Sequence, residues 1–402
     1  MRFNRAIAII AAFLVSVQVA AEPGPPGAAA DSTDALDGFV EQQMAQTGIV
    51  GLAAAIILDR KLVWMQGYGF ADKQRGMPFT PDTIMNIGSI SKTVTGAALM
   101  HAVQEGKLDL DTDINEYLPF KVVNPNFPEE PITSRQLATH TSSIVDRPAA
   151  YEGAYHYGGD SPQSLGEFLV DYFSTEGKLY SRENFLDARP GSQREYSNIA
   201  AGLAGYIVEL ATDAKLNAYT REFLFTPLGM HNTGWFLAEI DPSRHSQLYI
   251  AQDGVSIPIL NYGLTTYPDG GVRTSVADLS HFFIALLNGG EYAGNRVLDA
   301  DSVAQMLKFQ FTESNKPDNV LLAEKNSGIF WQSMFNVTRM GHGGSDPGVQ
   351  TMMLADLSGR IGVILFINTS VSGADLIKSN AIFDAIWKHA ESLDAPSSAG
   401  SR

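Results

Sequence analysis

Runs of apolar residues near both ends of the chain predict β-strands. Residues 50–72, VGLAAAIILDRKLVWMQGYGFAD, read as two strands joined by a turn near Asp59 and Arg60, since isoleucines and aromatic residues flank the polar turn. Residues 349–368 read as a second pair of strands around a turn at 356–359. The strand-forming segments therefore lie at the two ends of the chain.

Apolar residues three and four positions apart predict helices elsewhere. This spacing is clearest over residues 199–213 and 276–289. Residues 35–47, residues 374–393 and the stretch from Ser89 to about Glu105, which Gly106 ends, also read as helices. Residues 110–290 as a whole are expected to be mostly helical with long loops.

Together these elements predict an α/β (α+β) fold, in which an antiparallel sheet built from both chain ends is flanked by helices and carries an inserted all-α lobe. One domain over residues 35–393 would hold an α/β core at about 35–90 and 290–393 and a helical lobe at about 91–289. A crevice between two lobes is a natural place for a functional site.

The first residues have the order of a secretory signal peptide. Arg2 and Arg5 precede an apolar stretch from Ala6 to about Val17, and small residues follow up to Ala21. The alternative is an uncleaved membrane anchor, but the apolar run is shorter than the roughly 20 residues that a span needs. We expect a signal peptide over 1–21, a flexible linker over 22–34, a mobile tail over 394–402 and a periplasmic or secreted bacterial protein.

Charge and residue usage exclude several classes of function. The formal net charge of −16 argues against nucleic acid as a partner, because the two polyanions would repel each other. The chain has no cysteine, which excludes disulfides, thiolate catalysis and Cys-ligated zinc. The histidines show no metal-binding spacing, so we expect no metal and no cofactor. The expected partner is a small substrate, and the oligomeric state stays open.

The stretch NIGSISKTVTG, residues 86–96, offers a nucleophile and a base. On a helix, Ser89 and Lys92 are three residues apart and share a face, whereas Ser91 points away from it. A serine hydroxyl needs a base to take its proton, and a lysine serves only if burial and its neighbours lower its pKa toward neutrality. The alternative is a serine that caps the helix beside a solvated lysine.

Two downstream stretches offer residues that would complete such a site. Tyr196 and Asn198 stand just before a predicted helix, where a phenol can relay protons and an amide can orient a substrate carbonyl or amide. His342 is followed by Gly343 and Gly344, which would let a substrate backbone lie close to this segment. The three stretches together make a catalytic site a stronger interpretation than a helix cap.

In this order, Ser89-x-x-Lys92, Tyr196-x-Asn198 and His342-Gly343-Gly344 resemble the motifs of the serine β-lactamase and penicillin-binding protein family. The resemblance is closest to its class C-like branch of esterases, D-aminopeptidases and DD-carboxypeptidases. It runs from about residue 35 to 390, and the flanking stretches that share it are GKLDLDTDINEYLP (106–119), ITSRQLATHTSS (132–143), PLGMHNTGW (227–235) and PDGGVRTSVADLSHF (268–282). A β-lactamase/transpeptidase-like fold is implied.

The resemblance also implies catalytic roles. Ser89 would be acylated, and Lys92 would be its base. Tyr196 would share that proton and deliver it to the leaving group. The oxyanion hole would consist of the main-chain N–H groups of Ser89 and Ser345.

The substrate-binding residues that the resemblance implies are Asn198, His342, Gly343, Gly344 and Ser345. Asn198 would hold the substrate amide, and His342 would stand opposite Tyr196. Most efficient β-lactamases have Lys where this chain has His342. A fixed cation for a β-lactam carboxylate is therefore missing, because His is mostly neutral near pH 7. Ser143 stands where the family usually has Gly, and no glutamate can be assigned as a deacylation base.

These features predict an exported serine hydrolase, a peptidase that cleaves amide bonds of small peptides with D- or non-standard residues through an acyl-enzyme on Ser89. Cell-wall peptides and linearised non-ribosomal peptides such as opened microcystin fit that description. The alternatives are a carboxylesterase on the same machinery, a β-lactamase or penicillin-binding protein, and a non-catalytic binding domain, which the full set of catalytic side chains disfavours.

Overall fold

The computed structural model describes residues 33–252 and 254–394 and has a large antiparallel sheet at its centre. Seven strands follow the order β12-β13-β14-β15-β1-β2-β3, and neighbouring strands run antiparallel. Their bounds are β1 Gly51–Leu58, β2 Lys61–Asp72, β3 Met77–Pro78, β12 Gln332–Met334, β13 Arg339–Asp346, β14 Val349–Asp356 and β15 Ile361–Ile367. The sheet comes from both ends of the chain, which confirms the predicted fold class.

Strand β1 lies inside the sheet because it is apolar on both faces. Its even-numbered residues from Leu52 to Ile56 pack in the cluster of the terminal helices, and its odd-numbered residues from Ala53 to Ile57 pack in the larger core. Asp59 and Arg60 form the turn to β2 with φ values of 47° and 65°, the left-handed region that a tight hairpin turn needs. The predicted first pair of strands is therefore confirmed.

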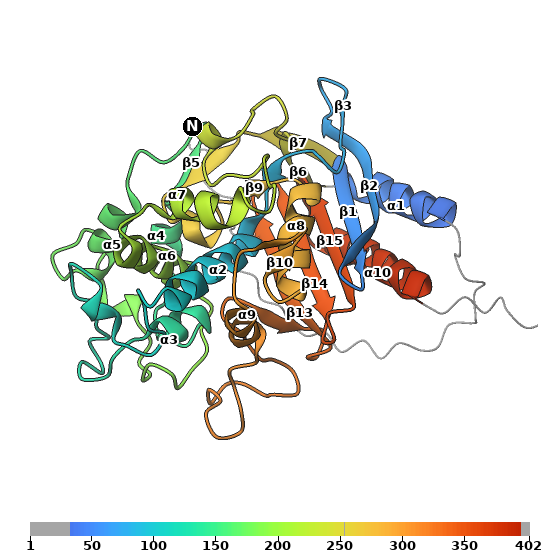
Figure 1. The fold of residues 1–402 in the computed structure, drawn as a ribbon. Helices are drawn as coiled ribbons and strands as arrows, with labels where there is room; N and C mark the ends of the chain where they lie inside the picture. The colour runs from blue at the N-terminus through green and yellow to red at the C-terminus, as the bar shows by residue number, and fades with distance from the viewer. Residues whose placement is uncertain (1–32, 253, 395–402) are drawn as a thin grey trace, which may run out of the picture.

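Helices cover both faces of the sheet (Figure 1). The helices α1 (Thr33–Thr47) and α10 (Ala374–Asp394) pack against each other on one face, where α10 contacts β1 and β15. On the other face, α8 (Val276–Leu287) packs against β1, β2 and β15. The structure thus places α8 with the sheet, whereas the sequence pattern assigned this helix to the lobe.

The remaining helices form the lobe beside the sheet, with α2 among them (Figure 1). Their bounds are α2 Ser91–Gln104, α3 Ser134–Ala138, α4 Pro148–Glu152, α5 Leu165–Phe173, α6 Asn198–Thr212, α7 Leu216–Thr220 and α9 Ala300–Leu307. Helix α2 contacts α6, α7 and α9, and it is buried without a break from Ser91 to Met100. Any polar group on this part of α2 must therefore find its partner inside the protein.

Residues 110–290 are less purely helical than their spacing predicts. Short strands pair there and nearby: β4 Met85–Asn86 with β9 Arg273–Thr274, β5 Tyr155–Tyr157 with β8 Tyr262–Leu264, β6 Leu248–Gln252 with β7 Val255–Ile259 and with β16 Thr369–Ser370, and β10 Glu291–Tyr292 with β11 Asn295–Arg296. Strands of two to five residues are too short to leave a clear alternation in the sequence.

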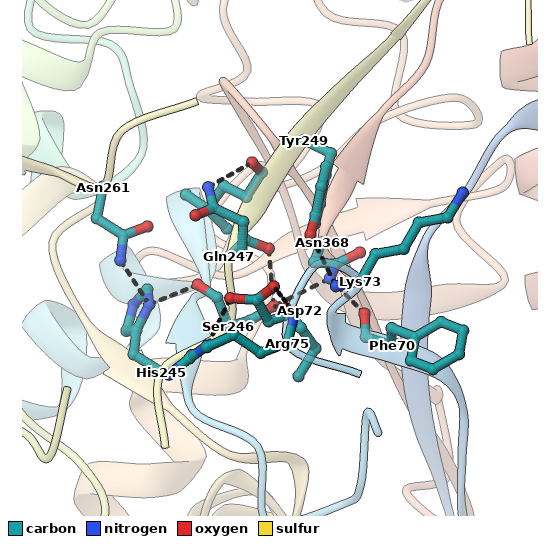
Figure 2. A network of polar contacts seen from close by, with 12 residues as sticks. Phe70, Asp72, Lys73, Arg75, His245, Ser246, Gln247, Tyr249, Asn261 and Asn368 are labelled. Carbon is teal, nitrogen blue, oxygen red and sulfur yellow. Dashed lines mark hydrogen bonds and ion pairs between the residues drawn. The ribbon is translucent and has the colours of Figure 1, made fainter. Parts of the chain in front are cut away.

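A polar network joins the end of β2, the residues around the start of β6 and Asn368 after β15 (Figure 2). Asn368 Nδ2, just after β15, donates to Phe70 O at 3.0 Å and to Ser246 Oγ at 2.9 Å. The ring of the neighbouring His245 lies 3.2 Å from Asn86 Oδ1, in β4. Burial lowers the pKa of His245 to about 3, so this ring is neutral. The network fixes β4, the strand that leads into the turn of the expected nucleophile.

None of the helices in residues 33–252 and 254–394 has the length and apolar character to span a membrane. Within the same ranges, no group of three or more His, Asp or Glu side chains could hold a metal ion. The predicted signal peptide over 1–21, nearly all of the predicted linker over 22–34 and nearly all of the predicted tail over 394–402 lie outside the described residues.

Candidate active site

Ser89 lies in a 3₁₀ turn, Gly88–Ile90, that leads from β4 into α2. Gly88 has a φ of 53°, in the left-handed region that favours glycine. Ser89 is half-buried, whereas its neighbours on both sides are buried. Ser91 is used inside the fold, because its Oγ accepts a hydrogen bond from Val272 N at 3.0 Å. Of the two serines, Ser89 is therefore the one whose hydroxyl can meet a substrate.

Lys92 reaches Ser89 from the first turn of α2, as their three-residue spacing predicted. Lys92 Nζ lies 3.1 Å from Ser89 Oγ, 2.7 Å from Asn198 Oδ1 and 2.8 Å from the main-chain oxygen of Asp269. The side chain is fully buried, so the alternative of a solvated lysine is wrong. Since Asn198 Oδ1 accepts the bond from Lys92, its Nδ2 is the atom left to donate to a substrate carbonyl.

The charge of Lys92 departs from what a lysine base needs. Burial favours the neutral amine, yet three neighbouring groups outweigh burial and raise the pKa of Lys92 above its ordinary value. These groups are Tyr196, Asp269 and Asp346. The lowered pKa that the sequence interpretation required is therefore not met in the free site, and the charge of Lys92 depends on its surroundings.

Tyr196 is the second polar neighbour of the nucleophile. Its OH donates to Ser89 Oγ at 3.0 Å, and Lys92 Nζ lies 5.0 Å from the centroid of its ring. His140 packs against this ring with centroids 4.3 Å apart and the ring planes tilted by 32°, and its Nδ1 accepts from Ser197 N at 3.3 Å. Burial lowers the pKa of His140 well below its ordinary value, so the imidazole that packs against the Tyr196 ring is neutral.

Asp146 holds the loop that presents Tyr196 and Asn198. Its carboxylate accepts hydrogen bonds from Ser197 Oγ at 2.6 Å, Asn198 N at 2.6 Å and Ile199 N at 3.0 Å. These donors lie at the N-terminus of α6, where free N–H groups favour a negative charge. Asp146 was not predicted from the sequence, because a loop aspartate carries no sign of which helix its carboxylate will meet.

His342 stands on β13 opposite Tyr196, with ring centroids 6.3 Å apart. Its Nδ1 lies 2.6 Å from Gly343 O, and its Nε2 lies 2.9 Å from Gln332 Nε2. A carbonyl only accepts and an amide nitrogen only donates, so Nδ1 carries the hydrogen and Nε2 accepts. Burial lowers the pKa of His342 to about 3, which keeps the ring neutral. The third motif therefore supplies no cation for a substrate carboxylate.

Strand β13 runs so close to the nucleophile turn that Gly344 has no room for a side chain. A Cβ at this position would lie 2.2 Å from Ile87 O and 2.3 Å from Thr351 Oγ1. At the neighbouring Gly343, the nearest atom to such a Cβ would be 3.5 Å away, which is ordinary contact. Gly344 is therefore needed for the close approach of β13 to the nucleophile turn, whereas Gly343 is not.

The free edge of β13 places main-chain groups beside the nucleophile. Among the described strands, β12 pairs with β13 only over Arg339–Gly341, so from His342 onward that edge has no strand partner. A Cβ on Gly88 would lie 3.3 Å from Ser345 N, and Ser345 is exposed. The main-chain nitrogens of Ser89 and Ser345 are therefore close together, as an oxyanion hole requires.

The structure brings the predicted residues to one place. They are Ser89, Lys92, Tyr196, Asn198, His342, Gly343, Gly344 and Ser345. It adds Asp269 and Asp346, which act on Lys92 and which the sequence analysis did not single out. Asp269 belongs to a stretch that shares the family resemblance, but nothing in that stretch indicates which side chain it lies against.

Comparison with known proteins decides the family. The family profile described as Beta-lactamase matches residues 36–385. The chain belongs to the beta-lactamase family. This beta-lactamase family member belongs to a family of serine hydrolases and has the β-lactamase/transpeptidase-like fold that its motifs implied.

Individual relatives of this beta-lactamase family member differ in their names. It is 28% identical over 261 residues to Protein flp of Staphylococcus aureus (strain MRSA252), a match over 64% of this chain and 49% of that protein. The chain thus spans about half the length of the curated relatives that it matches first. The octameric penicillin-binding protein homologue from Pyrococcus abyssi has a TM-score of 0.67 and 25% identity, over 89% of this chain and 78% of that one. The D-amino acid amidase from Ochrobactrum anthropi SV3 complexed with D-phenylalanine has a TM-score of 0.70 and 23% identity, over 90% of this chain and 98% of that one.

Proposed function

We propose that this beta-lactamase family member is an exported serine hydrolase that cleaves amide bonds in small peptides with D- or non-standard residues. The observation that carries the proposal is the position of Ser89 Oγ, within hydrogen-bond distance of both Lys92 Nζ and Tyr196 OH. A serine hydroxyl in such a place becomes an activated nucleophile when the neighbouring lysine is neutral and can take its proton. Export is proposed from the signal-like order of residues 1–21.

The proposed reaction has two steps. Ser89 Oγ attacks the substrate carbonyl carbon while its proton passes to the pair formed by Lys92 and Tyr196, and the main-chain N–H groups of Ser89 and Ser345 stabilise the oxyanion. Tyr196 then returns the proton to the amide nitrogen, the C–N bond breaks, and the amine leaves an ester on Ser89. Water hydrolyses this ester, which releases the acid and restores the serine.

Two observations favour an amide substrate without a β-lactam ring. His342 is neutral, so the third motif offers no positive charge to a β-lactam carboxylate. The O. anthropi amidase shares the fold and was solved with D-phenylalanine, which supports small D-amino acid amides as first substrates to try. An uncharged ester needs no positive charge from the third motif either, and a carboxylesterase is the second candidate.

Substitution of the nucleophile tests the proposal. Ser89→Ala should lower turnover of D- and L-amino acid amides and dipeptides by about 1,000-fold or more, because no other group replaces the attacking oxygen. Intact mass spectrometry of the incubated wild type should show an acyl adduct that the variant lacks. The matched control is Ser91→Ala, which should keep turnover and lose about 1 kcal/mol of stability with its bond to Val272 N. Unchanged turnover in Ser89→Ala, or cleavage of esters alone, contradicts the amide proposal.

A further inference from the structure

Two carboxyl groups, those of Asp269 and Asp346, lie near Lys92 and have no part in the proposed reaction. Asp269 follows Pro268 in the segment that leads to β9, and its main-chain oxygen accepts the 2.8 Å bond from Lys92. Its side chain is buried. Asp346 is the last residue of β13, directly after Ser345, and is partly buried. A carboxylate in such a place is costly unless another charge compensates it.

Each of these carboxyl groups is held by one tyrosine. Tyr151 OH donates to Asp269 Oδ1 at 2.8 Å, and Tyr155 OH donates to Asp346 Oδ1 at 2.6 Å. The two phenol rings pack edge to face with centroids 5.7 Å apart. Burial raises the pKa of the Tyr151 and Tyr155 phenols well above the ordinary value, so both stay protonated and donate. Within the described residues, Asp269 Oδ2 has no partner that meets full hydrogen-bond geometry, although the nearby Thr266 hydroxyl acts to lower the pKa of Asp269.

The carboxyl group of Asp346 lies against the turn of the nucleophile. A Cβ on Gly88 would lie 3.1 Å from Asp346 Oδ2, and one on Gly270 would lie 3.4 Å from it. Asp346 therefore packs between the residue before Ser89 and the residue after Asp269. Burial raises the pKa of Asp269 to about 7 and that of Asp346 to about 6, while the charge of Lys92 acts in the opposite direction.

The hydrogen bonds of Lys92 are compatible with either charge. Asn198 Oδ1 and the main-chain oxygen of Asp269 can only accept, so both must receive N–H groups from Lys92. In the third contact, Lys92 Nζ donates to Ser89 Oγ at 3.1 Å. An ammonium donates to the serine, whereas a neutral amine accepts the serine proton and acts as a base. The surrounding charges decide between the two.

The other titratable groups around Lys92 are already engaged or uncharged. Asp146 faces it from the loop before α4 and caps α6, while His140, after α3, and His342, on β13, are neutral rings. Arg273, on β9, acts on Asp346 but donates its own N–H groups to main-chain carbonyls. Asp146 also interacts with Lys92, but apart from Tyr196 the groups that raise the pKa of Lys92 are Asp269 and Asp346.

We propose that Asp269 and Asp346 are positioning residues that set the charge of Lys92, and thereby the pH at which Ser89 is activated. The proposal rests on the proposed function, because it gives the serine proton to Lys92 and Tyr196. While both carboxylates are ionised, they keep a proton on Lys92, which then donates to Ser89. When one negative charge is lost, the amine becomes neutral at lower pH and can accept the serine proton.

The charge of Lys92 can be measured without any substrate. Protein labelled with ¹³C at the lysine Cε atoms is titrated by NMR from about pH 5 to about pH 11, and the Lys92 signal is assigned with Lys92→Arg. Asp269→Asn and Asp346→Asn keep the side-chain shape and should each lower the Lys92 midpoint by about one to two pH units. Asp278→Asn is the matched control, since it removes a carboxyl group whose partners are Asn232 N and Thr233 Oγ1. It should leave the Lys92 midpoint unchanged.

The pH profile of kcat/KM gives a second reading. Its acid limb should move to lower pH in both Asn variants, because loss of a carboxylate favours deprotonation of Lys92. Asp346→Glu keeps the charge and should return the limb toward the wild-type position. Tyr151→Phe and Tyr155→Phe remove only the donor to each carboxylate and should shift the limb in the same direction by less, which keeps the test valid if an Asn variant fails to fold.

The outcomes separate this proposal from the proposed function. An unchanged Lys92 midpoint in the folded variants overturns the role of the two carboxylates. Loss of activity at every pH with an unmoved acid limb also overturns it, because the carboxylate would then handle the proton itself. A lowered Lys92 midpoint in a protein that hydrolyses none of the amides upholds the charge assignment and refutes the amidase proposal instead.

Discussion

At the scale of single residues, Lys92 and Tyr196, the two polar neighbours of Ser89 Oγ, differ in how firmly the protein holds them. Lys92 is fully buried and gives two of its N–H groups to carbonyl oxygens, so it stays in place through the reaction. Tyr196 is half-buried and bonds Ser89 through its OH, with the neutral ring of His140 packed behind it. Of the two, the phenol is the better placed to carry a proton from the serine to a leaving group.

Substitution of Tyr196 should therefore reduce the hydrolysis of amides more than the hydrolysis of esters. Tyr196→Phe keeps the packed ring and removes the proton carrier, so kcat for an amide should fall by about 100-fold or more. The loss for a p-nitrophenyl ester should be clearly smaller, because its leaving group departs without a proton. Paired kinetics on an amino acid amide and an ester of the same acyl group measure the difference. Equal losses on both substrates would remove Tyr196 from leaving-group protonation.

Between elements, the site depends on the close approach of β13 to the turn before α2. These two segments come from opposite ends of the chain, and Thr351 Oγ1 on β14 donates to Ile87 O at 2.8 Å across the gap. The left-handed φ of Gly88 and the missing side chain of Gly344 let the backbones meet. A glycine in this strand is therefore a packing requirement, not a sign of a mobile loop.

A matched pair of glycine substitutions tests this packing. Gly344→Ala should lower stability by about 2–3 kcal/mol, because its Cβ would meet main-chain oxygen at 2.2 Å and force the strand away from Ser89. Gly343→Ala, one residue earlier, should leave the free energy of unfolding within about 0.5 kcal/mol of the wild type. Urea denaturation of both variants gives the comparison. If the two variants are equally stable, the strand and the turn are not packed tightly enough to exclude a Cβ at Gly344.

Across the whole molecule, buried titratable groups make stability depend on pH in opposite directions. His245 and His342 have a pKa of about 3 in the folded protein. The stability that these neutral rings contribute is therefore fully present above the pKa of histidine in the unfolded chain, and it is lost as the pH falls toward 3. The pKa of Asp269 is about 7 and that of Asp346 about 6. Their contribution is greatest below the unfolded pKa of about 4 and is lost as the pH rises through those values.

Asp269→Asn should therefore gain stability relative to the wild type as the pH rises. The difference should be smallest near pH 4 and should grow toward pH 8, by up to about 4 kcal/mol, because the variant has no carboxyl group to ionise. The two histidines are common to both proteins and do not affect the difference. Calorimetric Tm values at both pH values check it. A Tm difference that does not change with pH would mean that Asp269 is not held with a raised pKa.

The sequence predicted those parts of the fold and site that have local signals. The spacing of Ser89 and Lys92 and the hairpin at Asp59 and Arg60 needed only helix and turn geometry, and the structure has both. Strand β13 was not predicted, because its glycines leave no alternation of apolar residues. The effect of Asp346 on Lys92 was also not predictable, since it depends on where two distant segments meet.

The pairing of β1 with β15 also fixes the order in which the protein can be made. β1 ends at Leu58, and its partner begins at Ile361, so residues 59–360 must be synthesised before the two strands can join. Until then, one edge of an apolar strand stays open on the growing chain, and the long loop must be closed before the contact is gained. The central sheet therefore cannot be completed before β15 has been synthesised. A truncation that removes β15 should leave a chain that aggregates rather than a smaller folded core.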